Sequence, residues 1–121
     1  MKTNSLDFEI RFYERIIAEK PNYVEALSLL AQAYTLRKEY HKGFLMDARL
    51  TKLCPKDPLV YYNLACSYAL LGEKLKALKA LEKSVRLGYA DFEYLKKDAD
   101  LKSLHAEPRF KSLCHPDRKA G

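Results

Sequence analysis

The chain repeats itself with a period of 34 residues. Placing residues 58–91 beneath residues 24–57 gives eight identical pairs: Leu30/Leu64, Ala31/Ala65, Tyr34/Tyr68, Leu36/Leu70, Glu39/Glu73, Lys42/Lys76, Leu53/Leu87 and Asp57/Asp91. Average composition would give about two such pairs by chance. A fixed period of this length is typical of stacked helical arrays, in which each unit buries its apolar face against its neighbours. Such arrays present a surface and seldom carry out chemistry.

The spacing within the unit resembles the tetratricopeptide repeat (TPR). Each unit has a large apolar residue, then a leucine, an alanine and a tyrosine on one helical stripe, followed by a small residue in the next helix: Leu27, Leu30, Ala31, Tyr34 and Gly43, then Tyr61, Leu64, Ala65, Tyr68 and Ala77. A 34-residue helix–turn–helix unit is the TPR pattern. The resemblance, to the small bacterial type with a degenerate closing segment, implies an all-α, short right-handed α-solenoid of antiparallel helix pairs.

Helix-ending and helix-starting residues divide the chain. We expect one domain over residues 1–121, made of a half-repeat helix (5–20), two repeats (22–55 and 57–89), capping helices (91–114) and a flexible tail (115–121). Asp57 followed by Pro58 is typical of a helix start, and Gly88 of a helix end. Beyond residue 91 the period lapses, because it would place the charges of Asp98 and Lys102 at core positions.

The stripe opposite the core carries the functional hypothesis. A solvated helix face is usually charged, but Glu25 is the single charge among twelve residues on these stripes. In the TPR family the corresponding positions line a concave groove that grips a peptide or a partner helix. The resemblance therefore implies a peptide-binding groove with Tyr62 as its anchor, lined by Ser28, Leu29, Gln32, Thr35, Leu36, Leu59, Tyr62, Asn63, Cys66, Ala69 and Leu70.

Three roles remain open for such a chain. The first is an adaptor or assembly factor that binds a protein or peptide segment in the groove. In the second, the groove is covered by the N-terminal helix, by the C-terminal cap or by a second copy, which would make a self-associating scaffold. The third is a basic face for nucleic acid or an anionic membrane, because spacings of three and four place Lys76, Lys79, Lys83 and Arg86 on one side of a helix. No aromatic residue interleaves with them as a stacking platform, so nucleic acid is the weakest hypothesis.

Composition argues against catalysis, cofactors and metal. Four glycines leave little material for a phosphate-binding loop, and no nucleophile lies at a catalytic family's spacing from a histidine. The three cysteines form no CxxC pair and the three histidines are scattered, so we expect no metal site, no cofactor and a reducing cytoplasm. The longest uncharged run, Pro58–Gly72, has 15 residues and is too short to span a bilayer.

Overall fold

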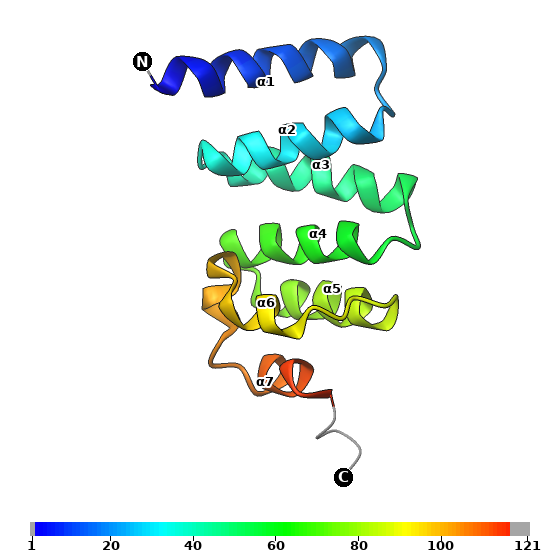
Figure 1. Ribbon diagram of the computed structural model, residues 1–121, viewed down its shortest axis with the longest axis vertical. Helices are drawn as coiled ribbons and strands as arrows, with labels where there is room; N and C mark the ends of the chain where they lie inside the picture. Colours follow the sequence, from blue (N-terminus) through cyan, green and yellow to red (C-terminus); the bar gives the residue numbers. More distant parts are fainter. Residues whose placement is uncertain (1, 117–121) are drawn as a thin grey trace. The chain divides into compact units, whose positions relative to one another are not determined.

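The computed structural model describes the backbone of residues 2–116 and the side chains of residues 5–116. The described residues contain helices and no strand, which confirms the predicted all-α class (Figure 1). Most of the tail predicted over 115–121 lies outside the described residues. The elements are α1 (Lys2–Glu19), α2 (Val24–Leu36), α3 (Tyr40–Leu53), α4 (Pro58–Leu70), α5 (Lys74–Arg86), α6 (Phe92–Lys97), the 3₁₀ helix η1 (Ala99–Leu104) and α7 (Pro108–Cys114).

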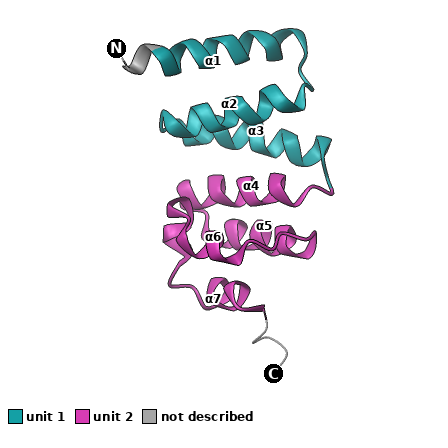
Figure 2. Ribbon diagram, viewed as in Figure 1, with its two compact units in different colours: residues 1–55 teal, residues 56–121 magenta. Residues whose placement is uncertain are grey.

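The chain divides into two compact units, residues 1–55 and residues 56–121 (Figure 2). Unit 1 holds α1 and the α2–α3 hairpin. Unit 2 holds the α4–α5 hairpin followed by α6, η1 and α7. Each repeat of the sequence therefore supplies one helical hairpin to one unit.

The core of unit 1 forms where α2 meets α1 and α3. The predicted stripe of α2 is buried, since Leu27, Leu30, Ala31 and Tyr34 are all nearly inaccessible. On the α1 side, Ile10 is buried against this stripe, and Leu6, Tyr13, Ile17 and Met46 pack around the cluster. At the rim, the Tyr34 hydroxyl donates to Glu14. Arg37 pairs with Asp7 at 2.7 Å. These contacts join α1 to α2.

Helices α2 and α3 approach closely because residue 43 has no side chain. A Cβ atom at Gly43 would lie 3.0 Å from Thr35 Oγ1 and 3.3 Å from the Ala31 carbonyl oxygen. Few real contacts of a Cβ atom are this short. In unit 2 the equivalent residue is Ala77, which is fully buried, and Thr35 is replaced there by Ala69. Each hairpin thus has its own combination of small residues at the crossing.

Both hairpins turn with the same backbone conformation. Lys38 and Gly72 adopt positive φ angles of 65° and 82°. The next amide reaches back in each case, from Glu39 to the Tyr34 carbonyl at 2.8 Å and from Glu73 to the Tyr68 carbonyl at 2.9 Å. This is the Schellman pattern of a helix C-terminus. The period of 34 is therefore visible in the turns as well as in the helices.

The segment after the second repeat packs back onto unit 2. Helix η1 contacts α4, and α7 contacts α5 and α6. Their apolar side chains are buried: Leu95, Leu101, Leu104, Phe110 and Leu113. Arg109 of α7 adds a two-pronged ion pair with Glu82 of α5, at 2.7 and 3.0 Å. Residues 92–114 therefore complete the core of unit 2.

Candidate protein-interaction face

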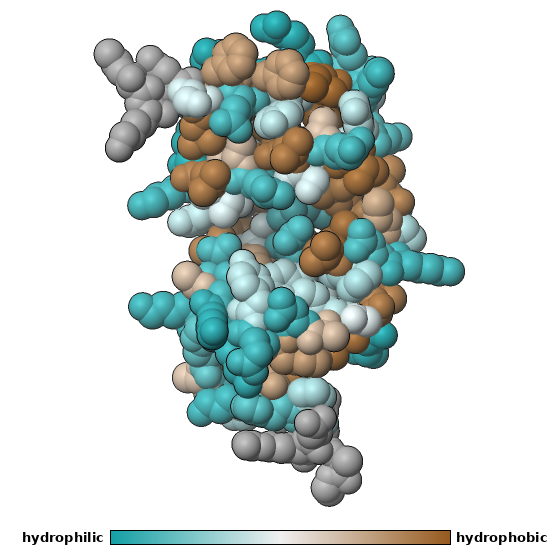
Figure 3. Space-filling view, viewed as in Figure 1, coloured by the Kyte–Doolittle hydropathy of each residue, from teal (hydrophilic) through white to brown (hydrophobic). Residues whose placement is uncertain are grey.

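The outward stripe of α2 is open to solvent. Leu29 is 43 % exposed and Leu36 is 73 % exposed, and Gln32 between them is also exposed. Ser28 and Thr35 are half-buried. The Thr35 hydroxyl donates to the Ala31 carbonyl at 3.1 Å, so it is engaged within its own helix. We call the set Ser28, Leu29, Gln32, Thr35 and Leu36 the α2 face. Hydrophobic side chains reach the surface of unit 1 in the space-filling view (Figure 3).

The equivalent stripe of α4 is largely covered, which corrects the interpretation of Tyr62 as an exposed anchor. Tyr62 is only 4 % exposed. Its ring stacks on Tyr89 with ring centroids 4.5 Å apart, and its hydroxyl donates to Asp98 at 2.6 Å. For this part of the predicted groove the structure follows the alternative in which the C-terminal cap covers the stripe.

Other residues of the α4 stripe meet the same segment. The Cys66 thiol lies 3.7 Å from the Asp98 carboxylate, and both Cys66 and Ala69 are buried. The Ala69 carbonyl accepts from the Ser103 hydroxyl at 3.4 Å. Leu59 remains exposed, and Asn63 and Leu70 are half-buried. The predicted groove residues thus divide between two units, and their use in binding stays a prediction.

A buried polar network holds the cap against α4. Asp98 begins η1 by accepting from the backbone N–H of Asp100 at 3.0 Å, while its other oxygen accepts from Tyr62. Burial, reinforced by the hydrogen bond to Asp98, raises the pKa of Tyr62 well above its ordinary value. Burial also raises the pKa of Asp100, and the neighbouring Asp98 adds to this shift. Tyr62 therefore keeps its proton and acts as a hydrogen-bond donor to a buried carboxylate.

The sequence did not reveal this network. Tyr94 and Asp98 come from the region where the repeat lapses, and Tyr89 from the end of the second repeat. The ring centroid of Tyr94 lies 6.2 Å from that of Tyr62. The one available signal was the pair Asp98 and Asp100 at the start of a short helix, which is typical of an N-cap. Nothing in their spacing indicated that the carboxylate of Asp98 would meet residue 62.

One group of possible metal ligands was also missed. Single ligand atoms of Cys66, Asp98 and Asp100 lie within 4.8 Å of one another. However, both oxygens of Asp98 already accept hydrogen bonds, from Tyr62 and from the Asp100 amide. The Cys66 thiol also donates to Asp98. Hydrogen bonds within the network therefore already account for the close approach of these three residues, which supports a structural network more directly than a metal centre.

Two lysines of the predicted basic face lie against tyrosine rings. The Lys83 ammonium is 4.9 Å from the centre of the Tyr61 ring, and that of Lys76 is 6.0 Å from the centre of the Tyr68 ring. Lys42 makes the same contact with Tyr34 in unit 1, at 5.6 Å. Because Lys42 and Lys76 are equivalent in the repeat, this cation–π contact is part of the repeated architecture.

Comparison with known proteins places the fold in a class. The solved structure "MamA MSR-1 C2" resembles this chain with a TM-score of 0.73 over 99 % of this chain and 72 % of that one, at 20 % sequence identity. This likeness and the helical hairpins define an all-α helical repeat fold of TPR type. No protein-family model matches the chain.

A curated protein shares sequence with part of the chain. A chloroplastic protein of Arabidopsis thaliana is 38 % identical over 52 residues, which are 43 % of this chain and 16 % of that protein. The chain therefore spans a small fraction of that protein's length. Among the described residues, none of the helices combines the length and the apolar character needed to cross a membrane.

Proposed function

We propose that this protein is a non-catalytic interaction module that binds a partner protein segment on the α2 face. The observation that carries the proposal is that Leu29 and Leu36 are exposed on a stripe that bears no charge beyond Glu25 at its start. Leucines held outward on a rigid helix supply apolar area for binding at little cost in backbone entropy. As in the small bacterial TPR proteins that the sequence resembles, the role would be that of a cytoplasmic adaptor or assembly factor.

The spacing of the two leucines suggests what the partner presents. Residues 29 and 36 are two helical turns apart, which is roughly 10.5 Å along the axis. A helical partner matches this with apolar residues seven positions apart. A partner in the polyproline II conformation matches it with apolar residues three positions apart, because that helix has about three residues per turn and rises about 3.1 Å per residue. Gln32 lies between the leucines and can bond a neutral polar group, so the expected segment is apolar with a neutral polar centre.

A charge introduced on the α2 face tests the proposal. Leu36→Asp should abolish capture of any specific partner from the native lysate, because a desolvated aspartate opposes apolar docking. Leu75→Asp is the matched control, since Leu75 is a comparably exposed leucine on α5 of unit 2. Captured proteins that disappear with Leu36→Asp but persist with Leu75→Asp support the proposal. Identical capture by wild type and both variants refutes it.

Self-association is a second candidate, favoured by a separate observation. Phe8 and Phe12 of α1 are exposed and stack with ring centroids 6.4 Å apart. A second copy could cover them. Sedimentation velocity across a wide concentration range separates the two candidates: a dimer that is lost on Phe12→Asp supports self-association through α1. A monomer at all concentrations leaves the α2 face as the binding surface.

A further inference from the structure

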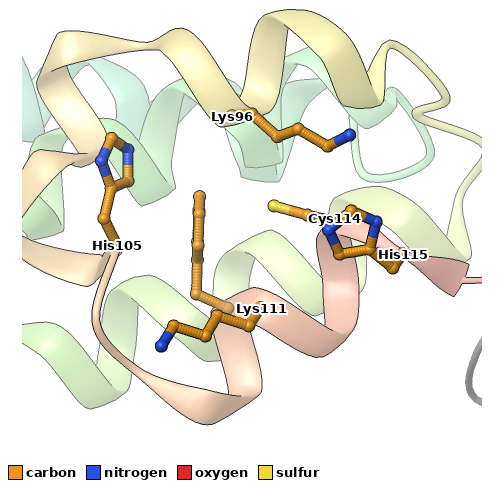
Figure 4. A pocket seen from close by; sticks show the side chains of 6 residues that line it. Lys96, His105, Lys111, Cys114 and His115 are labelled. Atoms are coloured by element: carbon orange, nitrogen blue, oxygen red, sulfur yellow. The ribbon is translucent and has the colours of Figure 1, made fainter.

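Unit 2 contains a pocket of about 250 Å³ that the interaction proposal does not use. Three elements form it: the end of α6, the residue that follows η1, and α7 with its C-cap. Figure 4 shows the side chains that surround it, Lys96, His105, Phe110, Lys111, Cys114 and His115. Side chains from three successive elements between residues 96 and 115 therefore line one pocket.

The lining of the pocket is basic. Four of its six residues carry or can carry a positive charge, namely Lys96, His105, Lys111 and His115, and none is acidic. Glu93 pairs with Lys96 at 3.1 Å, but its own side chain is 76 % exposed. The floor is apolar and neutral, because Phe110 and Cys114 are buried and burial raises the pKa of the Cys114 thiol. The cavity thus offers several cationic donors with no anion of its own.

One histidine nitrogen beside the pocket lacks a hydrogen-bond partner. The Nε2 atom of His105 is buried and makes no hydrogen bond with any described residue. Its ring packs against Phe110, with ring centroids 5.2 Å apart, which holds the imidazole in place. A buried polar atom without a partner is unfavourable. In the tautomer that carries the proton on Nε2, an acceptor oxygen of a ligand would satisfy this atom.

We propose that this pocket binds a phosphoryl group, either as inorganic phosphate or as a phosphomonoester. A phosphomonoester carries a charge of about −1.5 to −2 and three acceptor oxygens. The two lysines and the two histidines come from three places in the chain: the end of α6, the residue after η1, and α7 with its C-cap. They therefore suit a tetrahedral group with several oxygens better than a planar carboxylate with two. Lysine ammonium groups bind phosphate as point charges, and the His105 ring can add a hydrogen bond in the tautomer that carries the proton on Nε2. This site is independent of the α2 face.

Phosphorus-31 NMR and calorimetric titration of the full chain test the proposal at constant ionic strength. Inorganic phosphate and phosphoserine are titrated separately, with acetate as the carboxylate comparison. We expect saturable binding of the phosphate probes at millimolar concentration or below, and binding of acetate at least about tenfold weaker, which corresponds to roughly 1.4 kcal/mol. Tighter binding of phosphoserine than of phosphate identifies a phosphorylated side chain as the source, and the reverse identifies free phosphate.

Three variants locate the site. His105→Phe should weaken phosphate binding about tenfold or more, and Lys111→Ala about threefold or more, because each removes one charged or directed donor. Lys102→Ala is the matched control: it removes an exposed lysine of η1 that does not line the pocket. Its affinity should stay within about twofold of wild type. Circular dichroism and thermal melting check that each variant folds. If His105→Phe fails to fold, Lys111→Ala still tests the site, because Lys111 is exposed.

Three outcomes would overturn the proposal. The first is an absence of saturable phosphate binding by the folded wild-type protein. The second is an equal loss of affinity in Lys102→Ala and Lys111→Ala, which would mean diffuse attraction to a basic surface. The third is acetate bound as tightly as phosphate, which would make the pocket a general carboxylate site.

Discussion

Helices α2 and α4 are equivalent in the sequence repeat. However, the stripe that faces away from the core is exposed on α2 and covered on α4. On α2 the stripe is open, and Leu36 is among the most exposed apolar residues described. On α4 the same stripe is covered by residues 89–103, and Tyr62 and Cys66 are buried. The difference shows that a repeated helix can serve in one unit as a surface and in the other as the base for a cap.

The residues at equivalent positions explain why the cap selects α4. Position 62 carries a tyrosine that fills space against Tyr89 and satisfies Asp98, whereas position 28 of α2 carries a serine. A serine is too short to do either. The α4 stripe therefore supplies a ring and a hydrogen-bond donor that a returning chain can use, and the α2 stripe supplies isolated leucines.

Truncating Tyr62 should give the largest effect. Tyr62→Ala removes a buried ring, and we expect the free energy of unfolding to fall by about 3–5 kcal/mol, as for other buried aromatic residues cut to alanine. It also removes the shortest of the hydrogen bonds that the Asp98 carboxylate accepts. Urea denaturation followed by circular dichroism measures the change.

Two controls sharpen this result. Tyr62→Phe keeps the ring and removes only the hydroxyl, so it should cost about 1.5–3 kcal/mol for the lost hydrogen bond to a charged group. Ser28→Ala at the equivalent position of α2 should change stability by no more than about 0.5 kcal/mol. A melting curve for Tyr62→Ala that overlays the wild type would show that the cap does not cover α4 in solution.

At each helix crossing, of α2 with α3 and of α4 with α5, the stability should depend on a pair of residues that fit each other in size. Gly43→Ala places a methyl group 3.0 Å from Thr35 Oγ1, and the overpacking cost of about 1–3 kcal/mol should outweigh the helix-propensity gain of about 1 kcal/mol. The added change Thr35→Ala removes the clashing atom and reproduces the Ala69/Ala77 pair of unit 2. We expect the double variant to recover about 1 kcal/mol or more relative to Gly43→Ala alone, within the usual range of coupling between contacting residues.

The reciprocal change in unit 2 checks the same reasoning. Ala69→Thr brings a hydroxyl towards the buried Ala77 and should destabilise, and Ala77→Gly should relieve part of that cost. Denaturant unfolding measures the free-energy change of each single and double variant. If the changes of the two single variants simply add up in the double variant, in both units, the helix crossings do not depend on these residue pairs.

Much of the fold could be predicted because it depends on short-range patterns. The stripe of Leu27, Leu30, Ala31 and Tyr34 follows from helical periodicity, and its burial was confirmed. The helix start at Asp57 is confirmed by its side chain, which accepts from the Leu59 amide at 2.9 Å. Such features depend on residues a few positions apart, which a repeat displays twice.

The candidate site was harder because its environment is set by distant residues. Tyr62 meets Asp98 across 36 positions, and Asp98 belongs to a segment without the repeat's periodicity. Helical geometry placed Tyr62 opposite the core stripe, but it could not show what would pack there. No such segment packs on the α2 face among the described residues of unit 1. There the helical pattern predicted an outward-facing stripe, and its leucines are exposed.

The two hairpin turns offer a smaller test of the comparison. Lys38 adopts a left-handed conformation with φ of 65°, which costs about 1–2 kcal/mol for a residue with a side chain. Lys38→Gly should therefore stabilise the protein, by about 0.5–1 kcal/mol after the entropy of glycine is counted. The reciprocal Gly72→Lys should destabilise it by a similar amount. Thermal unfolding of the two variants measures both signs, and a stabilising Gly72→Lys would contradict the shared turn geometry.

The smallest effect on stability is expected at Leu36, and it separates the two stripes most directly. Leu36→Ala removes an exposed side chain, so the free energy of unfolding should change by no more than about 0.5 kcal/mol, against several for Tyr62→Ala. If a partner segment docks on the α2 face, the same substitution should weaken its binding by about 1–2 kcal/mol, because the apolar surface of Leu36 that the partner would bury is lost. Equilibrium unfolding and a binding titration on one preparation give both numbers. A large loss of stability in Leu36→Ala would instead mean that the α2 stripe is covered in solution, as the α4 stripe is, and the two helices would then share one role.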